Sequence, residues 1–148
     1  MMEEKILSKE RIEDLVHQAF EAQTKAYVPY SGFAVGAALL ARDGKIYQGC
    51  NIENASYTPT NCAERTAVFK AVSEGITEFD AIAIVGNKKS VSKGEGNYCP
   101  PCGVCRQVLR EFCNPKTFQI ILAKSETEYR IFKLEELLPM GFGPDDLS

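Results

Sequence analysis

Four cysteines have the spacing and context to do chemistry. Cys99, Cys102 and Cys105 lie at two successive CxxC spacings, and Cys62 stands in a separate segment. Cys62, Cys102 and Cys105 fall at the starts of two predicted helices, where partial positive charge and unpaired N–H groups lower the pKa of a thiol. If the two helix starts meet at one end of a sheet, these three thiolates can hold zinc and leave its fourth tetrahedral position open for water, as catalytic sites do.

Two charged residues follow Cys62 in the first turn of its helix. Glu64 can approach a metal-bound water without being a ligand, which predicts a proton shuttle. Arg65 can donate hydrogen bonds to the thiolates and withdraw part of their negative charge. The only histidine, His17, lies far away in the first predicted helix and is interpreted as an ordinary helix residue. The site is therefore predicted to be built from sulfur.

The remaining cysteine spacings leave alternatives open. Cys99-Pro-Pro-Cys102 could be a redox pair that cycles between dithiol and disulfide. Cys99 could also complete a four-ligand structural zinc site, although its simplest interpretation is a spare thiol on the loop. Cys50 and Cys113 belong to no metal spacing and are expected to be small core residues.

Length and composition set limits on the class of protein. A chain of 148 residues fits a single domain, expected here to cover 1–148, with a core that needs no disulfide or structural metal in order to fold. No apolar run approaches the ~20 residues of a membrane span, and the acidic start does not resemble a secretion signal. We therefore expect a cytoplasmic protein, with no membrane partner, whose cysteines bind metal or do redox chemistry. A net charge of −3 and a pI of about 5.3 argue against nucleic acid as a partner.

The elements that must position the cysteines follow from periodicity and turn residues. Ser8 is the expected N-cap of a first helix with apolar residues at helical spacing, and Asp43-Gly44 predicts a tight turn between two strands. The segment 87–98 before the cysteine motif is rich in Gly, Ser and Lys and is expected to be mobile and solvated. The order αββαβαβ(β)α predicts a three-layer α/β/α sandwich with a mixed sheet. The strands are expected at 34–41, 45–50, 81–86, 117–123 and 128–132, and the helices after the first at 62–74, 101–112 and 134–139.

The motifs together resemble one enzyme family. The sequence CAE at 62–64, followed by PCxxC at 101–105, resembles the zinc-dependent cytidine deaminases. Ala34 is the one visible departure in the first motif, where the family commonly has proline or another residue, and no functional consequence is expected. The small-subunit, three-cysteine branch is similar to this chain over PYSGFAVGAALL, GCNIENASY, CAERTA, KAVSEG, PCGVCRQVLREF and ELLP..FGPDDL.

The resemblance implies a cofactor and a reaction. It implies that Cys62, Cys102 and Cys105 hold Zn²⁺ and that Glu64 is the general acid/base, taking a proton from water and delivering protons to the ring nitrogen N3 and the leaving amino group. The implied function is hydrolytic deamination of cytidine and 2′-deoxycytidine to uridine and 2′-deoxyuridine, with release of ammonia, as in pyrimidine salvage.

The resemblance also implies how a small nucleoside would be bound. Phe33 would contact the pyrimidine ring, and Asn51 and Glu53 would hydrogen-bond the ribose hydroxyls. Phe142 would be lent to the site of a neighbouring subunit in a homotetramer with shared active sites. From the residues alone, both phenylalanines would be interpreted as core aromatics, and Asn51 and Glu53 as residues that satisfy a loop.

Two other functions remain to be weighed. One is a related deaminase of a larger aminopyrimidine nucleoside such as blasticidin S, or of cytosine in a polynucleotide. The acidic pI argues against a polynucleotide, and the NIEN motif at 51–54 favours a plain nucleoside. The other is a non-enzymatic zinc module, which requires Cys99 as a fourth ligand.

Overall fold

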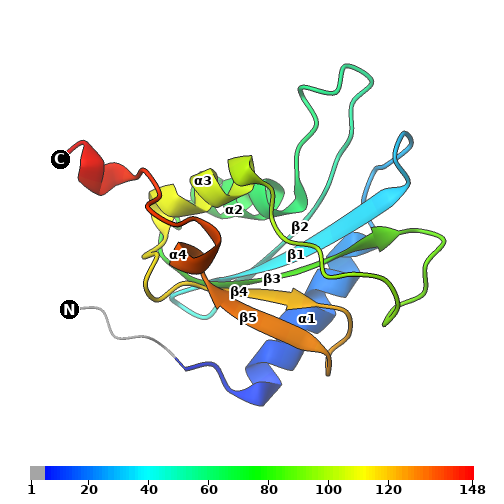
Figure 1. The fold of residues 1–148 in the computed structure, drawn as a ribbon, viewed down its shortest axis with the longest axis horizontal. Coiled ribbons are helices and arrows are strands. Elements are labelled where there is room, and N and C mark those ends of the chain that lie inside the picture. Colours follow the sequence, from blue (N-terminus) through cyan, green and yellow to red (C-terminus); the bar gives the residue numbers. More distant parts are fainter. Residues whose placement is uncertain (1–5) are drawn as a thin grey trace.

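A five-stranded mixed sheet forms the centre of the computed structural model, which describes residues 6–148 (Figure 1). The strand order is β2-β1-β3-β4-β5; β3 and β4 pair in parallel, and the other neighbouring strands pair antiparallel. The strands are β1 (Phe33–Ala41), β2 (Ile46–Cys50), β3 (Phe79–Lys88), β4 (Gln119–Ala123) and β5 (Tyr129–Lys133).

Helices cover both faces of the sheet, so the predicted three-layer α/β/α sandwich is confirmed (Figure 1). One face carries α1 (Lys9–Gln23). The other carries α2 (Ala63–Ser73), α3 (Gly103–Phe112) and α4 (Leu134–Leu137). A short 3₁₀ helix, η1 (Pro144–Asp146), follows near the C-terminus and was not expected from the sequence. Within residues 6–148, no helix combines the length and apolar character needed to cross a bilayer.

Local sequence signals explain where most elements begin and end. The Ser8 hydroxyl accepts a hydrogen bond from the Arg11 N–H at 3.1 Å, which caps α1 as predicted. Gly44, with φ +95°, makes the turn between β1 and β2, and Gly75, with φ +88°, follows the end of α2. Because β1 pairs along most of β3, from Phe33 opposite Lys88 onward, β3 is longer than the predicted strand at 81–86.

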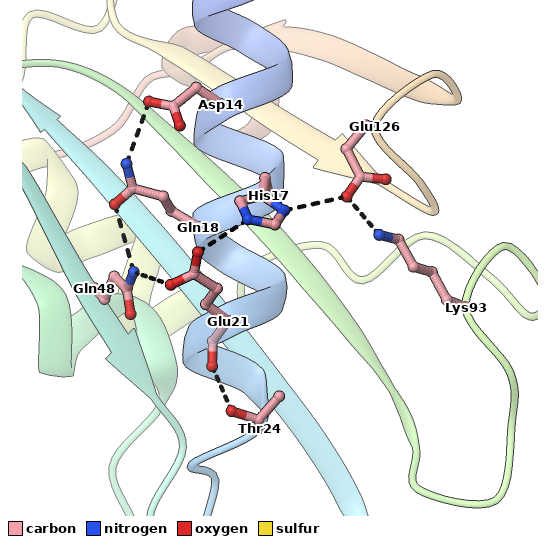
Figure 2. A network of polar contacts seen from close by, with 8 residues as sticks. All are labelled: Asp14, His17, Gln18, Glu21, Thr24, Gln48, Lys93 and Glu126. Atoms are coloured by element: carbon pink, nitrogen blue, oxygen red, sulfur yellow. Dashed lines mark hydrogen bonds and ion pairs between the residues drawn. The ribbon is translucent and has the colours of Figure 1, made fainter.

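The segment 87–98 is largely exposed, as expected for a solvated loop, and its side chains Lys93 and Tyr98 contact neighbouring elements. Lys93 pairs with Glu126 in the β4–β5 turn (Figure 2), and its Nζ lies 4.2 Å from the centroid of the Phe20 ring in α1. Two cationic groups of the β4–β5 hairpin lie 4.7 and 5.5 Å from the centroid of the Tyr98 ring. Composition alone does not show such contacts, because their partners are distant in sequence.

His17 belongs to the same surface network and lies on the exposed side of α1 (Figure 2). Its Nε2 is 3.0 Å from Glu21, and its Nδ1 is 3.8 Å from Glu126. These contacts match its interpretation as a helix residue outside the sulfur site.

Two strand glycines allow helices to approach the sheet closely. A Cβ atom at Gly36 would lie 1.9 Å from the Ala19 carbonyl oxygen of α1. At Gly49 it would lie 2.4 Å from the Ala63 carbonyl oxygen, at the first turn of α2. Backbone atoms cannot move aside as a side chain can, so both positions require glycine.

We expect Gly36→Ala to lower the free energy of unfolding by about 1–3 kcal/mol or more, because the new methyl group overpacks the contact with α1. Urea denaturation measures the change. The matched control is Gly103→Ala, since a Cβ at Gly103 meets no atom within 4 Å; its stability should stay within about 1 kcal/mol of the parent or rise. Equal stability of the Gly36→Ala protein and its parent would contradict the packing argument.

Candidate metal centre and active site

The topology of the sheet brings the two cysteine-bearing helix starts together. Both β2 and β3 run antiparallel to β1, so β2 and β3 are parallel to each other and their carboxyl ends lie at the same edge. The chain enters α2 after β2 and α3 after β3. Phe33, the first residue of β1, lies at this edge as well, opposite Lys88 at the end of β3.

Three cysteine sulfurs meet at this edge. Cys62 is the N-cap residue of α2, Cys102 is the N-cap residue of α3, and Cys105 lies in the first turn of α3. The Sγ of Cys102 is 3.8 Å from that of Cys62 and 3.5 Å from that of Cys105, and all three sulfurs lie within 4.8 Å of one another. Among residues 6–148 they form the one group of three or more Cys, His, Asp or Glu residues with this geometry.

The sulfur cluster favours a thiolate at Cys62. Hydrogen bonding from the Cys105 thiol and the Arg65 guanidinium, opposed by burial, lowers the pKa of Cys62 to about 5. The same pairing with Cys62 raises the pKa of Cys105. The hydrogen bonds among these groups therefore favour a thiolate in the cluster, and a thiolate is the form of cysteine that binds a metal ion. Arg65 donates from Nη2 to the Cys62 Sγ at 3.3 Å, as the sequence predicted.

The residues present fit a zinc ion. Three thiols from two helix starts can all reach a single ion, and they form the soft donor set that zinc prefers. Arg65 also supports a bound metal, because its Nε is buried without a hydrogen-bond partner among the described residues. A buried donor beside this cluster is suited to additional negative charge on the sulfurs.

Glu64 lies beside the cluster but outside the three-sulfur group. Its side chain is 4% exposed in the first turn of α2. Burial raises the pKa of the Glu64 carboxyl to about 7, and the negative charge of Cys62 acts in the same direction. A carboxyl that changes protonation state near neutral pH can both accept and return a proton, as a general acid/base must.

Cys99 lies on the loop before α3, as expected, and is half-buried against the core. A Cβ atom at Gly86 would lie 2.6 Å from the Cys99 Sγ and 3.1 Å from Cε1 of Phe33, so both side chains occupy the space that this glycine leaves open. Burial raises the pKa of the Cys99 thiol to about 12, with smaller contributions from Glu64 and Cys62. A thiol that stays protonated is a poor ligand and a poor redox nucleophile, and Cys99 is not part of the three-sulfur group.

Asn51 and Glu53 hold backbone groups at the same edge of the sheet. The Asn51 side chain accepts from the Val35 N–H and donates to the Phe33 carbonyl, each at 2.9 Å. Glu53 accepts from the N–H groups of Tyr30 and Ser31. Both residues thus satisfy backbone hydrogen-bonding groups of loops and strand ends, as their residue types alone suggested. Amide and carboxylate groups have further hydrogen-bonding positions, so these contacts do not exclude binding of a ligand.

The remaining candidates are placed as follows. Phe142 precedes η1 and is 57% exposed, so it is not a core aromatic of this chain. Cys113 is buried in the core, as expected. Cys50 is half-buried, and its Sγ donates to the Lys25 carbonyl at 3.4 Å. Arg106 donates to backbone carbonyls at 2.8 and 2.7 Å and holds α3 in place.

Comparison with known proteins gives one consistent result. The family model described as the cytidine and deoxycytidylate deaminase zinc-binding region matches residues 9–121, which include all three clustered cysteines. A curated relative from Sporosarcina psychrophila, described as cytidine deaminase, is 47% identical over 93% of this chain and 95% of that protein. One from Halalkalibacterium halodurans, with the same description, is 47% identical over 90% of this chain and 96% of that protein.

Solved structures agree. The crystal structure of cytidine deaminase from Burkholderia pseudomallei is similar with a TM-score of 0.77 and 45% identity, covering 87% of this chain and 97% of that one. That from Mycobacterium tuberculosis gives a TM-score of 0.73 and 42% identity, covering 88% of this chain and 95% of that one. Since the family match spans the helix starts that carry the three thiols, the chain belongs to the cytidine and deoxycytidylate deaminase family.

Proposed function

We propose that this protein is a zinc-dependent deaminase that converts cytidine and 2′-deoxycytidine to uridine and 2′-deoxyuridine. The observation that carries the proposal is the three-sulfur cluster beside a buried carboxyl whose pKa is raised to about 7. The similarity to proteins described as cytidine deaminases supports the same reaction over nearly the whole chain. Release of ammonia follows from hydrolysis of the exocyclic amino group at C4.

In this proposal Cys62, Cys102 and Cys105 hold Zn²⁺. When bound, the ion would supply Lewis acidity that lowers the pKa of the attacking water. Glu64 accepts the proton of the attacking water and delivers it to ring nitrogen N3 as the new bond forms at C4. Glu64 then takes the proton of the new hydroxyl group at C4 and passes it to the amino group, so that the C4–N bond breaks, ammonia leaves and the ring becomes uracil. Arg65 stabilises the negative sulfurs by its hydrogen bond to Cys62.

The substrate-binding roles are also proposals. Phe33 would contact the pyrimidine ring, which its position at the site edge of the sheet supports. Asn51 and Glu53 would bind the ribose hydroxyls with the hydrogen-bonding capacity they retain. Glu53 lines a hollow of about 370 Å³ together with Tyr30, Ser31, Tyr57 and Thr60, which gives a polar group access to a ligand from solvent.

We further propose a homotetramer with shared sites, in which Phe142 reaches the site of a neighbouring subunit. Large apolar side chains exposed among the described residues support an assembly, because burying them against another copy is favourable. They include Tyr27, Tyr57, Phe69 and Phe142. The proposed setting is pyrimidine salvage in the cytoplasm, where reducing conditions keep the cysteines available as ligands.

The function is tested by incubating the purified protein with cytidine, 2′-deoxycytidine, blasticidin S and a single-stranded oligodeoxycytidylate, while measuring bound zinc in the same sample. We expect turnover of the first two, seen as loss of cytosine absorbance and release of ammonia. The other two should react far more slowly. A protein that holds about one zinc per chain and deaminates neither nucleoside would refute the proposal.

Cys99 and Cys102 separate a catalytic zinc site from a structural one. We expect Cys102→Ala to lose most of its zinc, because two thiolates remain where three are needed. Cys99→Ala should keep its zinc and a large part of its activity, because Cys99 lies outside the three-sulfur group. Metal analysis after dialysis measures both. Loss of zinc from the Cys99→Ala protein would instead favour a four-ligand structural site.

Glu64→Gln keeps the size of the buried side chain but removes its ability to exchange a proton. We expect kcat to fall by about 10²–10⁴-fold or more, as is typical for loss of a general acid/base. Zinc content should stay at the level of the parent, because Glu64 is not in the sulfur group. A near-normal kcat in a folded, zinc-loaded Glu64→Gln protein would exclude the proposed role.

A further inference from the structure

The hydroxyl of Ser31 connects the two residues proposed to contact opposite parts of the nucleoside. Its Oγ donates a hydrogen bond to Oε2 of Glu53, the proposed ribose ligand. The same Oγ accepts a hydrogen bond from the backbone N–H of Phe33, the proposed ring contact, at 3.0 Å. One small side chain thus joins the carboxylate on the loop after β2 to the first residue of β1.

The Glu53 carboxylate receives its described hydrogen bonds from a single turn of the chain. Its other oxygen, Oε1, accepts from the N–H of Tyr30 at 3.0 Å and from the N–H of Ser31 at 3.1 Å. The Ser31 hydroxyl is the largest influence that lowers the pKa of Glu53, so this carboxylate is ionised at neutral pH. Ser31 donates two of the three hydrogen bonds, and only the one from its side chain can be removed by substitution.

The backbone of Phe33 is held on both sides by these same polar residues. Ser31 holds its N–H, and the Asn51 amide holds its carbonyl at 2.9 Å. Gly32, between Ser31 and Phe33, has φ +67°, a conformation that turns the chain and lets the Ser31 hydroxyl reach the N–H two residues ahead. The Ser31 hydroxyl is therefore the one side-chain group among the described residues that hydrogen-bonds to both the backbone of Phe33 and the carboxylate of Glu53.

We infer that Ser31 is a positioning residue for the reaction, fixing the Glu53 carboxylate relative to Phe33 so that ribose and pyrimidine are engaged together. The inference rests on the proposed function and adds the residue that couples its two binding elements. Ser31 acts through the groups it orients, and preorganisation of this kind reduces the cost of binding. Ser31 could not be singled out from the sequence, because serine next to glycine is typical of a turn and its partner Glu53 lies 22 residues away.

The test compares Ser31→Ala with Ser31→Thr, which keeps the hydroxyl group. The substrates are cytidine and 2′,3′-dideoxycytidine, which lacks the 2′- and 3′-hydroxyl groups of the ribose but keeps the 5′-hydroxyl. For Ser31→Ala we expect KM for cytidine to rise about tenfold, as for a lost hydrogen bond to a charged group, with kcat little changed. The preference for cytidine over the dideoxynucleoside should fall by a similar factor, and Ser31→Thr should restore it.

Two controls separate positioning from general damage. Ser73→Ala also removes one side-chain hydrogen bond, to the Lys70 carbonyl at 2.7 Å, but at the far end of α2, and should leave both substrates unaffected. In a Glu53→Ala background, Ser31→Ala should have little further effect on the preference, because the carboxylate that Ser31 orients has already been removed. If Ser31→Ala folds poorly, Ser31→Cys, similar in size with a weaker donor, carries the same expectation.

The inference is overturned if the Ser31 variants lose both substrates equally, or if the preference is unchanged in folded protein. Zinc content and thermal melting, measured on each variant, identify a folding defect. The proposed function is contradicted by a different measurement, namely the absence of cytidine turnover by the parent protein. The two failures are therefore distinguishable.

Discussion

The parallel orientation of β2 and β3 about the antiparallel strand β1 is the constraint from which the site follows. It places both helix starts and the first residue of β1 at one edge of the sheet, although the chain reaches these points at residues 33, 62 and 102. Helix starts are where a thiolate is least costly to form. The fold therefore supplies three ligand positions, and the loops before them need only end at the correct residue.

Charge balance explains why the cluster carries one arginine and one buried carboxyl. Three thiolates around a divalent ion leave a net negative charge, which makes a bound water less acidic than in a histidine site. The Arg65 hydrogen bond to Cys62 withdraws part of that charge. The burial that raises the pKa of Glu64 also makes it a stronger proton acceptor than an exposed carboxylate. The lower acidity expected of the water at a three-thiolate site is thus offset by the greater basicity of the Glu64 carboxylate.

Much of the fold could be predicted from the sequence because its signals are local. Ser8, Gly44 and Gly75 mark boundaries through capping and turn chemistry that depends on neighbouring residues. The three cysteines could be grouped because each falls at a helix start. The length of β3, the contacts of the 87–98 loop and the packing of Cys99 against Gly86 could not be predicted. Each depends on a partner distant in the chain, as the space left by Gly86 does for Cys99.

The metal-binding and nucleoside-binding parts of the site are fixed by different interactions, so they differ in how they respond to substitution. The metal half depends on helices that pack onto the sheet, with α2 held close at Gly49. The nucleoside half depends on side-chain hydrogen bonds to loop and strand backbone, from Ser31, Asn51 and Glu53. Packed helices resist local change, whereas a hydrogen-bonded loop can lose one contact and remain folded. Substrate preference can therefore change through single residues of the loops while the metal centre stays intact.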